Sequence, residues 1–176
     1  MGDGQAGAAV TVTISIAWIE GRNLLLLIDE FIGLVEGPRS PADPALARLT
    51  PIAYPDDDVA AAEFRRGTSD QLLDRRRRDA EEVRADLAGF AGEQDDSRDV
   101  LEAHDVVLAA ARVDPWLRTL AAIRLVVASR LGIDRDDRHA VDDPRFHVYD
   151  WLGYRLEDLI QRADAIDQQG TSSATE

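Results

Sequence analysis

The chain has 176 residues, which suits one domain that buries about 70% of the surface of its unfolded chain. Cysteine is absent and all 20 basic residues are arginine, so disulfides, thiolate metal sites, cysteine nucleophiles and lysine chemistry are excluded. The net charge of −14 opposes contact with phosphate backbones, so we expect no direct binding of nucleic acid by this chain. The same charge favours a basic protein as partner.

Neither a secretory signal nor a membrane-spanning stretch is predicted. Residues 1–9 lack the basic start of a signal peptide, and the longest apolar run, Leu24–Ile28, is far too short to cross a bilayer. We therefore expect a cytoplasmic protein that makes no contact with a membrane. Small and polar residues predict a disordered N-terminus at 1–9 and a disordered tail at 166–176, with a single helical regulatory domain at 10–165 between them.

The first predicted element is a strand at residues 10–16, where β-branched side chains alternate with threonine and serine. A lone strand needs a partner, and the short β-branched run Asp105–Leu108 is our candidate. A helix over 17–35 follows, because its apolar residues recur at spacings of three and four and a Gly-Pro pair at 37–38 ends it.

Shorter and more polar helices are predicted in the middle of the chain. Asp43, followed by proline, has the pattern of an N-cap that opens a short helical turn. An acidic cluster favours a second short helix at about 57–66. The pattern Thr68-x-x-Gln71 is that of a capping box, which predicts a separate helix over 68–87.

The strongest helical patterns come last, after a polar loop at 88–97. Asp-Pro pairs at 114–115 and 143–144 lead helices over 116–131 and 145–163. The predicted fold class is therefore mainly α. We expect a bundle of about five to six helices with a small two-stranded β element that contains the N-terminal strand.

No motif for catalysis, a cofactor or a metal is found. There is no nucleophile elbow, phosphate loop or glycine-rich dinucleotide motif, and His104, His139 and His147 lack the spacing of metal ligands. Asp134 begins a pattern like a calcium loop, but His139 and Arg145 stand where glycine and glutamate are required. We predict a protein that is no enzyme and has no cofactor or metal, with a carboxylate-based enzyme as the least favoured alternative.

The basic run Arg75–Arg78 has two interpretations. It could bind phosphate, or it could be a solvated helix face. We favour the solvated face because acids stand four residues away along the expected helix, as in Asp74 with Arg78 and Arg77 with Glu81.

Two further features concern the last two helices. Arg124 falls beside the apolar stripe of its helix, so it needs a partner, and Asp150 could supply one in a structural ion pair. Trp151 points away from the main stripe of its own helix, with Val148 and Arg155 on the same side. The favoured interpretation is that this helix buries two faces, and the alternative is an exposed surface for a partner.

Several short sequence blocks follow one another in a fixed order: Asp43–Leu49, Ala53–Asp57, Ala62–Arg66, Trp116–Arg118, Ile123–Val126, Ser129–Ile133 and Val148–Gly153. In this order the blocks resemble the actinobacterial oxidative-stress regulator family, whose AosR-like members are catalogued as a domain of unknown function. The resemblance covers about residues 10–163. Members of that family are commonly encoded beside the ClpS proteolytic adaptor and a cysteine-biosynthesis cluster.

The resemblance implies regulation without catalytic residues. It suggests a non-enzymatic protein that contacts a sigma factor or another part of the transcription machinery, in stress response and control of cysteine biosynthesis. An accessory or adaptor role in Clp proteolysis is the alternative, and a homodimer is open. Because this chain has no cysteine and its one methionine is Met1, we expect that it cannot sense an oxidant through its own sulfur atoms.

Overall fold

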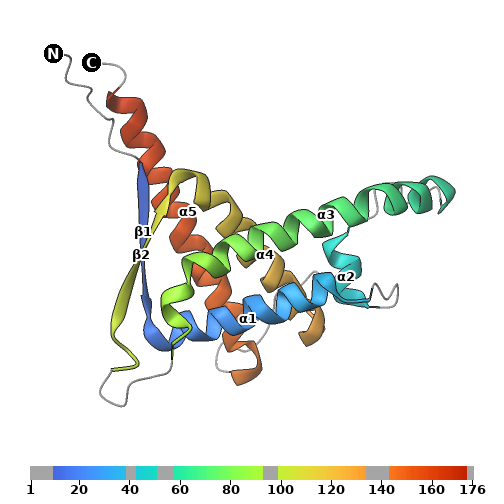
Figure 1. Cartoon of the computed structure of the whole chain (residues 1–176), viewed down its shortest axis with the longest axis horizontal. Helices are drawn as coiled ribbons and strands as arrows, with labels where there is room; N and C mark the ends of the chain where they lie inside the picture. Colours follow the sequence, from blue (N-terminus) through green and yellow to red (C-terminus); the bar gives the residue numbers. More distant parts are fainter. Residues whose placement is uncertain (1–9, 39–42, 51–57, 93–98, 134–142, 174–176) are drawn as a thin grey trace.

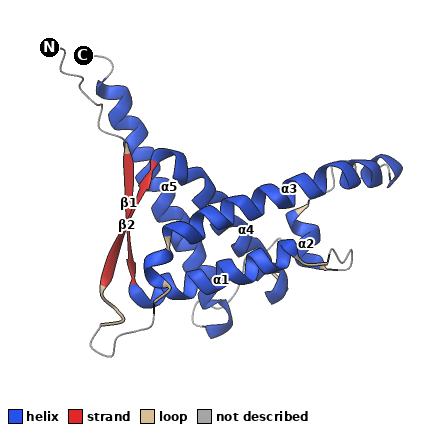
Figure 2. Cartoon of the chain, viewed as in Figure 1, coloured by secondary structure: helices blue, strands red, loops and turns tan. Residues whose placement is uncertain are grey.

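The computed structural model describes residues 10–38, 43–50, 58–92, 99–133 and 143–173. Within them the chain forms, in order, β1 (Thr11–Ala17), α1 (Trp18–Glu36), α2 (Pro44–Leu49), α3 (Asp58–Asp86), the short 3-10 turn η1 (Ala88–Phe90), β2 (Ala103–Ala109), α4 (Ala110–Leu131), the 3-10 turn η2 (Pro144–Phe146) and α5 (His147–Ser173). The predicted class, mainly α with a small two-stranded element that contains the N-terminal strand, is confirmed (Figure 1, Figure 2).

β1 and β2 pair in an antiparallel sheet, which confirms the predicted partner run Asp105–Leu108. The register places Ile14 opposite Val106. Alternate residues of each strand point into the core and the others lie in solvent, as the alternation in β1 predicted. The buried apolar members are Val12, Ile14, Ile16, Val106 and Leu108.

α4 is the central helix, because it packs against α2, α3, α5 and β2. Apolar residues recur along it at spacings of three and four, so it presents a continuous apolar face to its neighbours. The fully buried large side chains include Trp116 and Leu120 of α4, Trp18, Leu24 and Ile28 of α1, and Leu152 and Leu159 of α5.

A row of charged side chains joins α3 to α4. Arg118 of α4 donates to Asp79 of α3 through two hydrogen bonds, Nε to Oδ2 at 2.8 Å and Nη2 to Oδ1 at 3.2 Å. Arg112 of α4 reaches Glu82 at 2.7 Å and Asp86 at 2.9 Å. The hydrogen bond to Asp79 raises the pKa of the Arg118 guanidinium. Paired charges of this kind allow a helix with a largely polar sequence to pack on the core.

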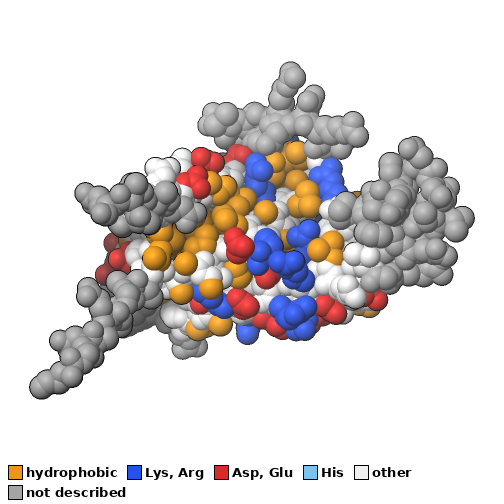
Figure 3. All heavy atoms as spheres, turned by 90° about the horizontal axis from the view of Figure 1, so that it is seen from above, with side chains coloured by type: hydrophobic (Ala, Val, Ile, Leu, Met, Phe, Trp, Pro, Cys, Tyr) orange, Lys and Arg blue, Asp and Glu red, His pale blue; other side chains and the backbone are white. Residues whose placement is uncertain are grey.

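The basic run Arg75–Arg78 lies within α3, and its acidic neighbours are shared with α4. Arg77 pairs with Glu81 one turn later, whereas Asp79 and Glu82 are bound by arginines of α4. On the face shown in Figure 3, arginine side chains lie among carboxylates and apolar side chains, with no continuous basic field.

Gly21 allows α1 to pack closely against the turn η1. A Cβ atom at Gly21 would lie 2.4 Å from the ring of Phe90, which is buried. Gly33 lies in the same helix, and nothing is within 4 Å of the place that its Cβ would take. In the sequence alone Gly21 and Gly33 look alike, because each is a glycine that weakens a helix.

Gly21→Ala is expected to lower the free energy of unfolding by about 1–3 kcal/mol, because the added methyl group overlaps the Phe90 ring. Gly33→Ala is the matched control and should raise that free energy by about 0.5–1 kcal/mol. Urea denaturation of both variants gives the two differences. Equal effects at the two positions would contradict the close packing of Gly21 on Phe90.

Asp43 joins the start of α2 to the end of α4. As predicted, it is the N-cap of α2, and its Oδ1 accepts a hydrogen bond from Ala45 N at 2.9 Å. Its two carboxylate oxygens also accept hydrogen bonds from Arg130 of α4, at 3.0 and 2.8 Å. The bond from Arg130, followed by the bond from Ala45, lowers the pKa of the Asp43 carboxyl below its ordinary value.

Asp43→Ala is expected to cost about 1–2 kcal/mol of stability at neutral pH. Because the pKa is lowered in the folded state, this contribution is present above the ordinary pKa of an aspartate and is lost as the pH falls through the lowered pKa. The unfolding free energies of the parent and the variant should therefore approach each other in acid. Denaturation at a series of pH values measures the gap, and a gap that stayed constant to about pH 2 would contradict the prediction.

α3 is one continuous helix, so the predicted break before Thr68 is wrong. The Thr68-x-x-Gln71 pattern stands inside the helix and does not open it. Residues on both sides favour a helix, and one glycine at position 67 costs only about 1 kcal/mol. A capping pattern acts only where a helix begins, and α3 begins at Asp58.

α4 begins earlier than predicted, because it follows β2 directly from Ala110. Pro115 therefore lies inside the helix. Its missing N–H would have met the carbonyl of Ala111 in the first turn, so only one hydrogen bond is lost. The predicted end is correct, since Gly132 closes the helix in the left-handed conformation with φ 72°.

α5 continues to Ser173, beyond the predicted end at residue 163. The tail that we expected to be disordered from residue 166 is therefore helical as far as Ser173. Ile166 packs against the core and extends the apolar face of the helix, which explains the added length. Residues 1–9, Ser97 in the predicted loop, and the acidic loop at 134–142 with His139 lie outside the described residues.

Candidate protein-binding site

Glu20 joins the first helix to the last one. It is the third residue of α1, and its Oε2 accepts a hydrogen bond from Ala17 N at 3.2 Å, as a glutamate does when it caps a helix start. Its Oε1 accepts from Trp151 Nε1 of α5 at 2.7 Å, and Oε2 also pairs with Arg155 Nη2. One carboxylate thus binds a backbone amide, an indole and a guanidinium.

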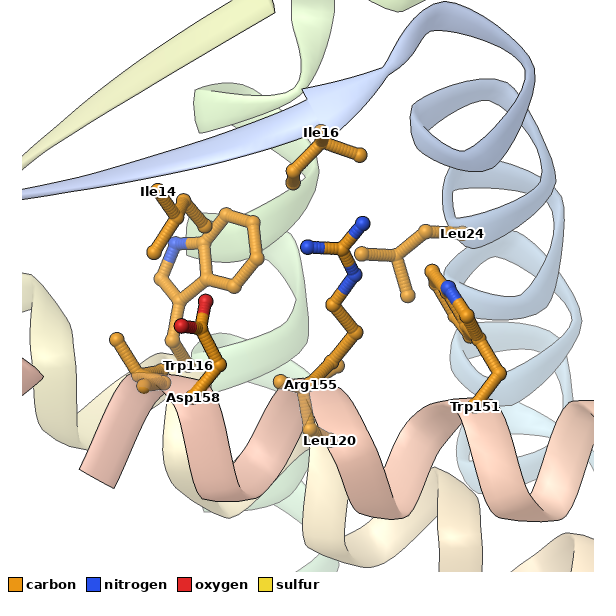
Figure 4. Close-up of a pocket in the computed structure, with 9 residues that line it drawn as sticks. Ile14, Ile16, Leu24, Trp116, Leu120, Trp151, Arg155 and Asp158 are labelled. Atoms are coloured by element: carbon orange, nitrogen blue, oxygen red, sulfur yellow. The ribbon is translucent and has the colours of Figure 1, made fainter. Parts of the chain in front are cut away.

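Two arginines of α5 bind the outer edge of β1. Arg155 Nη1 donates to Ser15 O at 3.0 Å, and Arg162 Nη1 donates to Thr13 O at 3.0 Å. In Figure 4 the guanidinium of Arg155 rises from α5 toward β1, beside Trp151. These bonds satisfy carbonyl groups that an edge strand would otherwise leave open to pairing with another chain.

A small cavity of about 10 Å³ lies beside Arg155. This volume is near the lower limit for one water molecule, so the cavity is too small for a substrate. Among the described residues, the buried Nε of Arg155 has no hydrogen-bond partner. Figure 4 shows the lining residues, which are Ile14, Ile16, Leu24, Trp116, Leu120, Trp151, Arg155, Asp158 and Leu159.

An open hollow of about 270 Å³ lies between α1 and α5, and we call it the α1–α5 groove. Its apolar lining comes from Leu27, Val148 and Trp151, and its polar lining from Glu20, Asn23 and His147. Val148 is 43% exposed and Trp151 is half-buried. Because the indole N–H of Trp151 is bound to Glu20, the ring is held in a fixed position beside this groove.

The structure brings together the three residues of the alternative prediction, in which this side of the helix is a surface for a partner. Val148 and Trp151 line the α1–α5 groove, and Arg155 lies over the Trp151 ring at 5.7 Å from its centroid. Arg155 is only 14% exposed, since its guanidinium is bound to Glu20 and Ser15. Its role is therefore to position Trp151 and β1, while the exposed surface belongs to Val148 and part of Trp151.

Sequence reasoning missed Glu20 and Leu27. A glutamate in the first turn of a helix is a local sign of capping, and that sign was present. The two partners of Glu20 on α5 follow only from the folded arrangement. Leu27 belongs to the apolar stripe of α1, so no local feature marked it as part of a surface.

Arg124 lies against α5, as its position beside the apolar stripe suggested. Its Nε donates to Tyr149 O at 3.3 Å, and its guanidinium lies 3.8 Å from the centroid of the Tyr149 ring. A Cβ atom at Gly153 would come within 3.2 Å of the Arg124 Nε, so the helices approach closely there. Asp150 follows Tyr149 in the chain, and its ion pair with Arg124 stays a prediction.

The described part of the chain holds no group of three or more histidine, aspartate or glutamate residues that could bind a metal ion. His104 lies on β2 and His147 begins α5. None of the helices described is both long enough and apolar enough to cross a membrane.

A family model described as a domain of unknown function (DUF2017) matches residues 5–163. No curated protein and no solved structure matches the chain.

Proposed function

The chain belongs to the DUF2017 family, and from that premise we propose that it is a non-enzymatic regulatory protein that binds a basic, DNA-binding part of the transcription machinery. A sigma factor is the partner that we favour, in an AosR-like role in stress response and control of cysteine biosynthesis. The α1–α5 groove is the observation that carries this proposal.

The groove has the features of a protein-binding surface. Its lining combines aliphatic side chains with a tryptophan that a hydrogen bond holds in place, and such rigid aromatic residues are enriched where binding energy concentrates. The hollow is open and shallow, and it lies between two helices, where a side chain or one turn of a partner helix would fit.

Charge supports a basic partner. The net charge of −14 speeds the encounter with a positively charged surface, and a DNA-binding protein carries such a surface. Glu20 is the carboxylate of the groove, and it is already bound to Trp151 and Arg155. Charge therefore steers the partner through the whole surface, while the groove supplies apolar contact.

The groove is poorly suited to catalysis. Its titratable side chains are Glu20 and His147, and the carboxylate of Glu20 is already fully engaged. A general acid and base would need free groups directed at one point. Binding is therefore a better proposal for this site than a carboxylate-based reaction.

Capture from the native host, followed by mass spectrometry, tests the proposal. The full chain should retain a sigma factor or another RNA polymerase component. Recovery of Clp subunits instead would support the rival role as a proteolytic adaptor. Recovery of neither class, under low-salt conditions that favour charged contacts, would contradict both roles.

Oxidant response gives a separate prediction. Peroxide treatment of the purified chain alone should leave its affinity for the partner unchanged, because it has no cysteine and Met1 is its one methionine. Titration of an untreated partner with treated and untreated chain measures this. A change in affinity would show that the chain itself senses the oxidant by another route.

A further inference from the structure

The outer edge of β2 is open in the described structure, unlike the outer edge of β1. Arg155 and Arg162 bind the edge carbonyls of β1, at Ser15 and Thr13. Within the described residues the sheet has two strands, so no strand pairs with the other side of β2. An unpaired strand edge offers backbone donors and acceptors to an incoming segment.

The register shows which backbone groups of β2 point outward. Ser15 lies opposite Asp105 and Thr13 opposite Val107. Because the carbonyls of Ser15 and Thr13 face away from β2, these are the pairs that exchange no hydrogen bonds. In such pairs the backbone groups of both strands point away from the partner strand. The N–H and C=O groups of Asp105 and Val107 therefore lie along the outer edge of β2.

A cleft of about 300 Å³ runs beside this edge. Its lining includes Trp18, Phe90, His104 and the edge residues Asp105 and Val107. The Nε2 atom of His104 is buried and has no hydrogen-bond partner among the described residues. Val107 is 62% exposed on the opposite face of the sheet. The cleft thus combines open backbone groups, apolar rings and a polar atom that lacks a partner.

The charge at this edge is acidic. Asp105 and Glu102 are exposed, and no arginine in the described part of the chain pairs with Asp105. Asp86, at the cleft, is already bound to Arg112 and to the indole N–H of Trp116. Of these carboxylates, Asp105 is the one that lies on β2 itself and has no arginine partner among the described residues, so it is placed to meet a basic side chain.

We propose that the outer edge of β2 binds an extended segment of a partner protein as a third strand, in which a basic side chain lies opposite Asp105 and an apolar side chain enters the cleft at Trp18 and Phe90. This rests on the proposed function, in which the chain acts by binding a basic protein. Side chains of a strand alternate between its faces, so the segment alternates basic and apolar residues. Its backbone or a polar side chain supplies the partner that His104 Nε2 lacks.

A second copy of this chain is the less suitable occupant. Antiparallel pairing of β2 with its own copy would bring Asp105 and Glu102 of both copies to one edge. It would also join two chains that each carry a net charge of −14. A basic segment removes this repulsion, which is why we assign the edge to it.

A synthetic peptide of seven residues, the length of β2, tests the inference. The probe alternates arginine and valine. One comparison peptide carries glutamate for arginine, and the other carries N-methylated arginine, which keeps the charge but removes the backbone N–H groups opposite Asp105 and Val107. Binding is measured by fluorescence anisotropy, and amide hydrogen exchange of the full chain locates it. We expect the arginine peptide to bind and the amides of Asp105 and Val107 to become protected. The N-methylated peptide should bind more weakly, because it has the same charge but lacks these donors.

Charge variants separate this edge from general attraction to an acidic chain. Asp105→Arg should weaken binding of the arginine peptide by roughly threefold to fivefold and favour the glutamate peptide. Glu30→Arg, at an exposed position of α1, makes the same change in net charge and should have a smaller effect. Equal effects of the two variants, or binding without protection at Asp105 and Val107, would overturn the inference. Protection of these amides in a peptide-free dimer would also overturn it.

Affinities of the native partner for variants of the two sites show which of the two proposals fails. Suppose that a substitution in the α1–α5 groove weakens binding of the native partner, but that the partner binds Asp105→Arg and Glu30→Arg with equal affinity. The inference about β2 is then overturned, while the proposed function stands. If both sites matter, the partner spans the groove and the strand edge.

Discussion

Glu20→Ala is expected to lower the free energy of unfolding by about 3 kcal/mol. The substitution removes the cap of Ala17 N, the acceptor of the Trp151 indole and the partner of Arg155. Arg155 is only 14% exposed, so its charge would be left largely out of water with Ser15 O as its remaining bond. The loss of a partner for a partly buried charge is the largest part of the cost.

Glu20→Gln removes the charge and keeps one of the two acceptor oxygens. The amide oxygen still accepts a hydrogen bond, so this variant should lose roughly half as much stability as Glu20→Ala. Glu30→Ala, at an exposed position of the same helix, is the control and should change stability by less than about 0.5 kcal/mol. Denaturation followed by circular dichroism gives these values.

Tryptophan fluorescence tests the same contact independently. Trp18 and Trp116 are buried, so iodide should quench Trp151 most strongly. Release of its indole in Glu20→Ala should increase this quenching. If Glu20→Ala lost no more stability than Glu30→Ala and quenching did not change, Glu20 would not join α1 to α5 in solution.

Asp79→Ala is expected to lower the free energy of unfolding by roughly 2–3 kcal/mol. It leaves Arg118 without the two hydrogen bonds that join α4 to α3. This loss of stability stays below the 3–5 kcal/mol typical of a fully buried pair, because about 37% of the Arg118 side chain is exposed to solvent.

A double-mutant cycle isolates the pair. Arg118→Ala and the double variant should show a coupling of about 1–2 kcal/mol, so that the double variant loses less than the sum of the single changes. Asp114 is the matched control, because it also pairs with Arg118 but is 77% exposed. Asp114→Ala should cost less than about 0.5 kcal/mol. A coupling near zero between Asp79 and Arg118 would show that the row of ion pairs does not hold α3.

Elements with a local cause could be predicted from the sequence. The alternation at residues 10–16, the N-cap at Asp43 and the helix end at Gly132 each depend on a few neighbouring residues, and all three were predicted. Local signals failed where two outcomes share one pattern. A proline after aspartate can open a helix or stand inside its early turns, and Pro115 does the latter.

The candidate site depends on contacts between distant parts of the chain. Glu20 meets Trp151 and Arg155 across 131 and 135 positions, and Arg118 meets Asp79 across 39. A sequence pattern of one helix records only which of its faces is apolar. It placed Val148, Trp151 and Arg155 on one side of α5. The carboxylate that binds Trp151 and Arg155 comes from the first turn of α1, and only the folded arrangement brings it there.

A single comparison of affinities decides whether the α1–α5 groove binds the partner. Val148→Arg and Ile160→Arg change residues of α5 that are 43% and 40% exposed, and they alter the net charge equally, but only Val148 lines the groove. With the captured partner purified, Val148→Arg should weaken binding by about tenfold, or 1.4 kcal/mol, while Ile160→Arg stays within about twofold of the parent. Equal affinities for the two variants would contradict a regulatory role exerted through this groove.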